Sequence, residues 1–162
     1  MNYSEYSPGR LLAANLPHGE DLLGSVAALC RSASIRTGAF WVRGAVSSYT
    51  IGALDPRQKV YVTAHVASPG EIVSCSGGVA THDGAAAPTA HIVLADAQGG
   101  VTGGRLFSET RVFAGEIHLQ EWIGPPPVWA YDEVTGQMLW HFSRECPPNQ
   151  RPDMDTTGYG HE

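Results

Sequence analysis

Apolar residues recur at helical spacing in one part of the chain, between Gly19 and Ala33. Side chains three and four residues apart lie on one face of a helix, and Glu20 and Asp21 would fall in its first turn, where acids complement the helix dipole. The apolar positions are Leu22, Leu23, Val26, Leu29, Cys30 and Ala33. The pattern predicts one main helix over residues 19–33.

Most of the remaining chain, up to residue 123, is rich in β-branched and aromatic residues between glycine and proline turns. Such runs are typical of strands. The predicted strands are residues 10–15, 39–51, 59–67, 71–81, 89–95, 101–107 and 110–123. Together with the helix they predict an α+β fold, in which one main helix packs on a strongly twisted, largely antiparallel β-sheet.

The pattern changes at Gly124, which three consecutive prolines follow. Proline cannot donate to a sheet ladder, so we expect the core sheet to end here. Residues 128–131 and 137–142 flank a turn-forming segment and predict a C-terminal β-hairpin extension. Its aromatic side chains should pack on the rest of the protein; they are Trp129, Tyr131 and Trp140.

The length of 162 residues fits one domain and a tail. We predict a domain over residues 1–123 and an extension over residues 124–162, made of the proline-rich linker, the aromatic hairpin and a mobile polar tail from Cys146. The three cysteines are far apart and form no Cys-x-x-Cys pair. This favours reduced thiols over disulfides or a thiolate zinc site.

Net charge and composition limit the classes of partner that the protein could bind. The formal net charge is −6, from ten Lys and Arg against sixteen Asp and Glu, and the basic residues form no run. Because nucleic-acid binders need clustered cations, the charge argues against a nucleic-acid partner. The chain has neither the apolar run of a membrane span nor a signal-peptide pattern at its start, so we expect a cytoplasmic protein without a membrane partner.

Turn chemistry brings two polar side chains together. If Ala97-Gln98-Gly99 is a three-residue hairpin loop with Gly99 in the left-handed conformation, His91 lies opposite Arg105. Cross-strand neighbours are about 5 Å apart at Cβ, so an imidazole and a guanidinium would converge on one spot, which suits an anion or a carbonyl oxygen. The alternative is structural: Arg105 pairs with a nearby carboxylate and His91 is an ordinary sheet histidine. The candidate carboxylates are Glu71, Glu109 and Glu116.

Several segments resemble the plant and prokaryote conserved (PPC) domain family in order and spacing. They are GEDLLGSVAALC at 19–30, RGAV at 43–46, GEIVSCSGGV at 70–79, the hairpin around residue 98 and EIHL at 116–119, so the resemblance covers residues 10–122. It implies an α+β unit with a strongly curved sheet, similar to that of acetolactate decarboxylase, and a homotrimer.

The resemblance also implies a pocket that has lost its metal. Family members commonly carry His-x-His on the first hairpin strand and Gly-Gly-His after the turn, a grouping that looks like a zinc site. The matching positions here are Thr89, His91 and Arg105. Arginine has no lone pair to give and would repel the ion, so we expect neither a metal nor another cofactor.

We therefore expect a metal-independent enzyme of the lyase, isomerase or cyclase type, such as biosynthetic pathways use, acting on an anionic or oxygenated small molecule. His91, Arg105 and Glu116 are the predicted catalytic residues. The predicted substrate-binding residues are Thr89, Glu71, Arg43, Trp129, Tyr131 and Trp140. Glu71 and Glu116 have a second interpretation as structural partners of Arg43 or Arg105.

Two other functions remain open. The first is a non-catalytic DNA-associated or regulatory interaction module, because plant relatives join this domain to an AT-hook; that Arg-Gly-Arg-Pro hook is absent here. The second is a zinc-dependent lyase.

Overall fold

The computed structural model describes residues 2–142; residue 1 and residues 143–162, which include the predicted tail from Cys146, lie outside the described part. The elements in chain order are β1 (Ser7–Leu16), α1 (Leu22–Ala33), β2 (Gly38–Asp55), β3 (Val60–Val66), β4 (Gly70–His82), β5 (Ala85–Ala95), β6 (Val101–Ile123), β7 (Val128–Asp132) and β8 (Gln137–His141). No helix among the described residues is long and apolar enough to cross a membrane.

The predicted α+β class is wrong. Of the described residues, 66% are in strands and only 9% in a helix, and the strands form one eight-stranded mixed sheet. The sheet is mixed because β7 runs parallel to β4, where Thr81 pairs with Val128. The prediction treated the helix as equal in importance to the strands. In the structure α1 has only 12 residues, and the curved sheet itself encloses most of the core.

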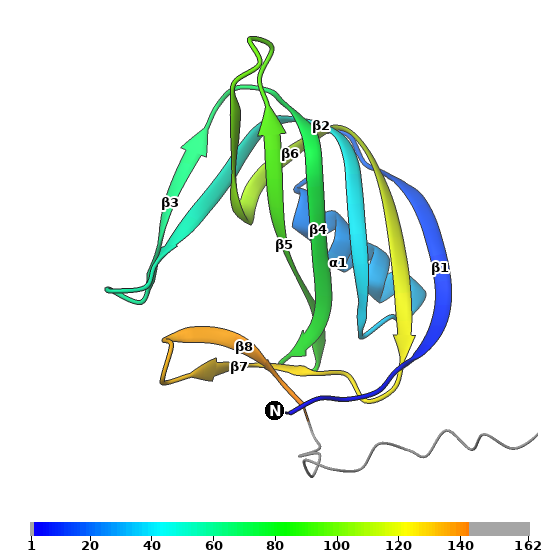
Figure 1. Ribbon diagram of the computed structural model, residues 1–162. Coiled ribbons are helices and arrows are strands. Elements are labelled where there is room, and N and C mark those ends of the chain that lie inside the picture. The colour runs from blue at the N-terminus through cyan, green and yellow to red at the C-terminus, as the bar shows by residue number, and fades with distance from the viewer. Residues whose placement is uncertain (1, 143–162) are drawn as a thin grey trace, which may run out of the picture.

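Two long strands produce this curvature. β2 pairs with β4 and with the second half of β6, and farther along with β3 and the first half of β6. Because β6 also pairs with β5, and β5 with β4, the pairings close a ring through β2, β6, β5 and β4. Figure 1 shows the curled sheet, with β1 added at the outer edge of β6.

β6 is a single strand where the sequence predicted two. The predicted break falls at residues 108–109, and there the backbone is irregular rather than interrupted: Glu109 has φ +68°, and the register against β2 shifts nearby. Two hydrogen bonds from Thr110 stabilise this kink. Its hydroxyl donates to the Phe107 carbonyl, and its backbone N–H donates to the Asp21 carboxylate. A bulge of this kind bends a strand without ending it.

α1 begins later than predicted. Asp21 is its N-cap and accepts a hydrogen bond from the Gly24 amide at 2.9 Å, so the acids expected in the first turn lie before it. The helix ends at Ser34, which adopts a left-handed conformation with φ 57°. Leu22, Val26 and Cys30 are its buried residues.

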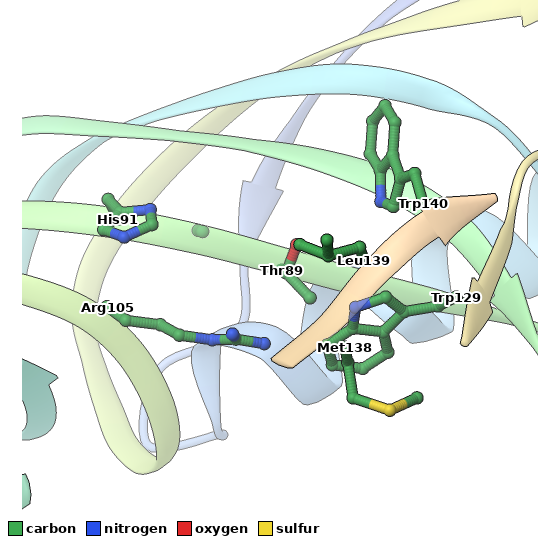
Figure 2. A pocket seen from close by; sticks show the side chains of 8 residues that line it. Thr89, His91, Arg105, Trp129, Met138, Leu139 and Trp140 are labelled. Atoms are coloured by element: carbon green, nitrogen blue, oxygen red, sulfur yellow. The ribbon is translucent and has the colours of Figure 1, made fainter. Parts of the chain in front are cut away.

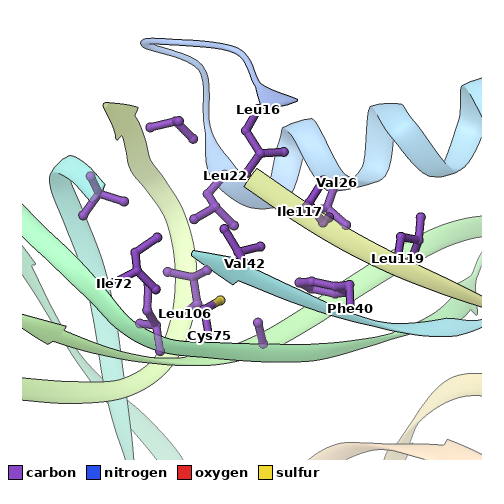
Figure 3. Packing of buried hydrophobic residues seen from close by; sticks show 14 of the residues in the cluster. Leu16, Leu22, Val26, Phe40, Val42, Ile72, Cys75, Leu106, Ile117 and Leu119 are labelled. Atoms are coloured by element: carbon purple, nitrogen blue, oxygen red, sulfur yellow. The ribbon is translucent and has the colours of Figure 1, made fainter. Parts of the chain in front are cut away.

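The core lies on the inner face of the curled sheet. In Figure 3 the buried side chains of α1 meet those of β2 and of the second half of β6. Fully buried members include Leu22, Val26, Phe40, Ile117 and Leu119. The side chains that alternate with these strand residues point to the opposite, outer face, which carries both His91 and Arg105.

β7 and β8 form a hairpin that crosses one end of this outer face (Figure 1). The Thr81 amide donates to the Pro127 carbonyl at 2.9 Å and attaches the hairpin to β4. At the far end, the Gln137 side chain donates to the Lys59 carbonyl at 3.2 Å, next to β3. The hairpin is therefore held at both ends.

Candidate functional site

A cavity of about 230 Å³ lies between β5, β6 and the β7–β8 hairpin. We call it the Arg105 pocket. One wall is polar and comes from the sheet, and the other is largely apolar and comes from the hairpin, as Figure 2 shows. Its lining residues are Thr89, Ala90, His91, Arg105, Trp129, Met138, Leu139 and Trp140.

The predicted pairing of His91 with Arg105 is confirmed. The Asp96 amide donates to the Gly100 carbonyl at 2.9 Å, and Gly99 has φ +84°. The Asp96 carboxylate accepts hydrogen bonds from the amides of Gln98 and Gly100 at 2.9 and 2.7 Å. This side chain fixes the loop, and the loop fixes the register that places the two polar groups side by side.

Three aromatic rings surround the Arg105 guanidinium, and we call them the aromatic cage. Its Cζ atom lies 4.9 Å from the ring centroid of Tyr61, 5.3 Å from that of Trp129 and 5.7 Å from that of Phe107. The Tyr61 hydroxyl also accepts a long hydrogen bond from Arg105 Nη1 at 3.4 Å. Cation–π contacts hold a guanidinium in place without neutralising its charge.

Among the described residues, neither Arg105 nor His91 has a carboxylate partner. The alternative in which Arg105 pairs with Glu71, Glu109 or Glu116 is therefore wrong. Glu116 instead accepts from Arg43 Nε at 2.6 Å across β2 and β6, as its structural interpretation predicted. This pair is exposed, with 72% and 52% of the two side chains accessible.

Small residues and aromatic contacts position the hairpin wall. A Cβ atom at Gly78 would lie 2.5 Å from Cζ2 of Trp140, so the indole packs directly on the bare backbone of β4. Trp140 also contacts Trp122 of β6 edge-on, with ring centroids 6.1 Å apart. Next to Trp129, the His82 imidazole lies 3.2 Å from the Trp129 carbonyl oxygen and packs against its ring.

The structure unites some of the predicted site residues and separates others. Those that line the Arg105 pocket are Thr89, His91, Arg105, Trp129 and Trp140. Glu116 and Arg43 lie farther along the outer face, where they line a separate hollow together with Glu71. Tyr131 is near the hairpin tip, 61% exposed, and does not line the pocket.

Sequence reasoning missed four residues of this site. Met138 and Leu139 line the pocket from β8, and Tyr61 and Phe107 complete the aromatic cage. Alternation along a strand was the available signal for Phe107, because it lies two residues after Arg105 and shares its face. Tyr61 comes from β3, and no local pattern connects that strand with Arg105.

The buried cysteines do not contribute a nucleophile. Burial raises the pKa of the Cys30 thiol to about 11 and that of the Cys75 thiol to about 12. Both residues belong to the core. Since the thiolate is the reactive form, these thiols behave as small apolar side chains.

The residues at the positions where the resemblance implies a zinc site do not fit the ion. Thr89 offers a hydroxyl, His91 one imidazole and Arg105 a guanidinium without a free lone pair. Zinc requires three or four donors. Within residues 2–142, no group of three or more His, Cys, Asp and Glu side chains is arranged to hold a metal ion.

The sequence was compared with family models, and one for the Plants and Prokaryotes Conserved (PCC) domain, the family called PPC above, matches residues 3–123. The chain belongs to the PCC domain family. The match ends at the last residue of β6, so the hairpin that closes the Arg105 pocket lies beyond the matched segment. A search of curated proteins found no match.

Solved structures share the fold. A metal-containing protein from Archaeoglobus fulgidus is 34% identical, with 88% of this chain and 100% of that one covered and a TM-score of 0.84. A plant- and prokaryote-conserved protein from Pyrococcus horikoshii is 29% identical, with 90% and 100% covered and a TM-score of 0.82. A candidate DNA-binding protein from Bacteroides thetaiotaomicron is 19% identical, with 86% and 99% covered and a TM-score of 0.75.

Proposed function

We propose that this PCC domain protein is a non-catalytic, regulatory binding module for a small organic anion, which it holds in the Arg105 pocket. The observation that carries the proposal is the Arg105 guanidinium in its aromatic cage, which has no carboxylate partner within residues 2–142 and lies beside His91 and Thr89. A carboxylate would receive charge-assisted hydrogen bonds from Arg105, while the flat apolar part of the ligand would lie against Trp129, Met138 and Trp140.

The volume of the pocket and the difference in polarity between its two walls support a ligand of this kind. A volume of about 230 Å³ suits a molecule of roughly ten non-hydrogen atoms rather than a dinucleotide. Positive charge lies on the sheet side and apolar surface on the hairpin side, so a ligand with an anionic head and an apolar body satisfies both.

Binding without turnover fits the arrangement better than the predicted lyase, isomerase or cyclase. That prediction placed Glu116 among the catalytic residues, and Glu116 is engaged with Arg43 outside the pocket. Among the described residues, the pocket lining contains one imidazole, that of His91, and no carboxylate. Reactions that move a proton on and off a substrate commonly use an acid and a base in matched positions.

A thermal-shift titration tests the proposal with benzoate and its neutral isostere benzamide. We expect benzoate to raise the melting temperature in a saturable way, and benzamide to have little effect because it lacks the charge that Arg105 recognises. Equal responses to both compounds, or no response to benzoate, salicylate and hexanoate at millimolar concentration, would contradict anion binding.

Several finer expectations stay predictions. They are the homotrimer, the similarity to acetolactate decarboxylase, the cytoplasmic location and the boundary between residues 1–123 and 124–162. Sedimentation velocity tests the homotrimer directly. The zinc-dependent lyase is tested by metal analysis of protein purified without a histidine tag, and we expect substoichiometric zinc because Arg105 occupies a ligand position.

DNA association is a second candidate. Its support is that similar structures from Bacteroides thetaiotaomicron and Ralstonia eutropha are described as candidate DNA-binding proteins, at 19% and 20% identity. The net charge of −6 opposes it. A gel shift with submicromolar affinity and a steep dependence on salt would favour DNA association over the anion module.

A further inference from the structure

A second hollow shares no lining residue with the Arg105 pocket. It has a volume of about 600 Å³ and lies between the end of β1 and the exposed side of α1. Its floor is formed by small helix residues, Gly24, Ser25 and Ala28, and one rim by Asn15 and Leu16 of β1. We call it the β1–α1 groove.

β1 borders the groove with a free strand edge. Within residues 2–142, its only strand partner is β6, so its other edge has backbone groups without a ladder. The first part of β1 is protected, because Pro8 and a register shift interrupt it. Residues 11–16, Leu-Leu-Ala-Ala-Asn-Leu, keep a regular register with β6 and contain no charge and no proline. An unprotected edge of this kind is able to pair with a strand from another chain.

The geometry of the groove favours an added peptide over a second copy of this chain. On the helix side of β1, Leu12 and Ala14 pack against the core and Leu16 belongs to it. A second copy's β1 would therefore arrive with these side chains already engaged, and it could not fill the groove. A separate extended segment has free side chains on that face.

Charge at the two ends specifies the segment further. Glu20 lies at the end of the groove near the helix N-terminus and Arg31 at the other end, and neither has an ion-pair partner among the described residues. The nine helical steps from Leu22 to Arg31 rise about 14 Å, and Glu20 lies two residues before the helix, so the two charges are spaced by roughly five to six residues of extended chain. α1 runs antiparallel to β1, since Arg10 Nη2 donates to the Ala33 carbonyl while Leu16 packs near Leu22.

We propose that the β1–α1 groove binds an extended peptide, which adds to β1 as an antiparallel strand. The peptide carries small apolar side chains at alternate positions toward α1, a basic residue at its start beside Glu20, and an acidic residue at its end beside Arg31. Main-chain hydrogen bonds to residues 11–16 supply affinity, and the end charges fix direction. The proposal does not depend on the anion site, because no residue is shared between the two cavities.

The probe is a synthetic peptide, acetyl-Lys-Thr-Val-Thr-Val-Thr-Asp-amide, in which Lys, both valines and Asp share one face of the extended strand. It carries a fluorophore, whose anisotropy is followed as protein is added. We expect saturable binding and slower hydrogen exchange at amides within residues 11–16. Replacing the central threonine by proline removes one backbone N–H donor and interrupts the ladder, so binding should weaken at least tenfold. The peptide with Lys and Asp exchanged should also bind at least threefold more weakly.

Matched protein variants separate the groove from nonspecific adsorption. Ala28→Tyr fills the groove from an exposed helix position and should weaken peptide binding at least tenfold. Ala64→Tyr, at an exposed position on β3, should leave it within twofold. Both variants should keep the response to benzoate.

Three results would overturn the proposal. They are equal binding of the proline-containing peptide, unchanged binding by Ala28→Tyr, and concentration-dependent dimers that Ala28→Tyr dissociates, which would make a second copy the occupant of the groove.

Discussion

Arg43 and Arg105 extend from the same outer face of the sheet into opposite surroundings. Arg43 lies beside Glu116, and the two exposed side chains satisfy each other at 2.6 Å. Arg105 lies among aromatic rings and has no carboxylate within the described chain. An exposed ion pair leaves little charge for a ligand, whereas a caged guanidinium keeps its donors and loses much of its water. The surroundings of Arg105, rather than its residue type, therefore suit it to bind an anion.

Replacing each arginine by leucine tests this difference with the largest expected effect. Arg105→Leu should weaken benzoate binding by a factor of ten or more, because a charge-assisted hydrogen bond contributes about 1.5–3 kcal/mol. Arg43→Leu is the matched control and should change the affinity less than twofold. Tryptophan fluorescence reports binding, since Trp129 and Trp140 line the pocket. Similar losses in both variants would show that long-range charge, not the caged group, attracts the anion.

Removing one ring of the cage should have an intermediate effect. Trp129→Ala deletes a ring that contacts the guanidinium at 5.3 Å and also lines the cavity. We expect affinity for benzoate to fall about fivefold, from the loss of ligand packing and of a cation–π contact of about 0.5–1 kcal/mol. Calorimetry measures the change. Tyr131→Ala, which alters an exposed residue of the same strand, is the control, and an equal loss there would argue against the cage.

Displacing the β7–β8 hairpin should have a smaller effect on benzoate affinity. Gly78→Ala places a methyl group where Trp140 packs, so the indole must move. We expect affinity to fall about two- to threefold, with altered near-ultraviolet circular dichroism from tryptophan. An unchanged spectrum and affinity would mean that Trp140 does not set the shape of the pocket.

The Arg10–Glu121 and Arg43–Glu116 ion pairs should also differ in how strongly their contribution to stability depends on pH. Arg10 donates from Nε and Nη2 to the two carboxylate oxygens of Glu121 at 2.7 and 2.9 Å, and its side-chain hydrogen bonds hold the pKa of Glu121 below its ordinary value of 4.5. Because the folded pKa is the lower one, this stabilisation is present above the unfolded pKa and disappears as pH falls through the folded pKa.

Melting temperatures measured from pH 6 to pH 3 should therefore decline less steeply for Glu121→Gln than for the unmodified protein. Glu116→Gln should follow the unmodified protein, because exposed pairs contribute less than about 1 kcal/mol. Parallel curves for all three proteins would contradict the distinction between the two ion pairs.

Local chemistry determined what the sequence could predict. The loop around Gly99 fixes its own register, so the pairing of His91 with Arg105 followed from a few neighbouring residues. The helix also followed from spacing, although its start depended on Asp21 acting as a cap rather than as a first-turn acid. These features need only interactions close in sequence.

Long-range pairing determined the rest. The class was wrong because β2 and β6 bend and pair with several strands, which no local pattern encodes. For the same reason Tyr61 was missed and Glu116 was placed in the pocket. Strand alternation shows which face a residue occupies, but the neighbours on that face depend on how the sheet curls.

The most direct measurement follows the Nε–Hε resonances of arginine side chains by NMR during a titration with benzoate. The account predicts that the Arg105 resonance shifts and saturates with benzoate and stays unchanged with benzamide, while the resonance of Arg43, bound to Glu116, does not move. An Arg105 resonance that ignores benzoate, or that moves no more than that of Arg43, would contradict the claim that the caged guanidinium is the anion site.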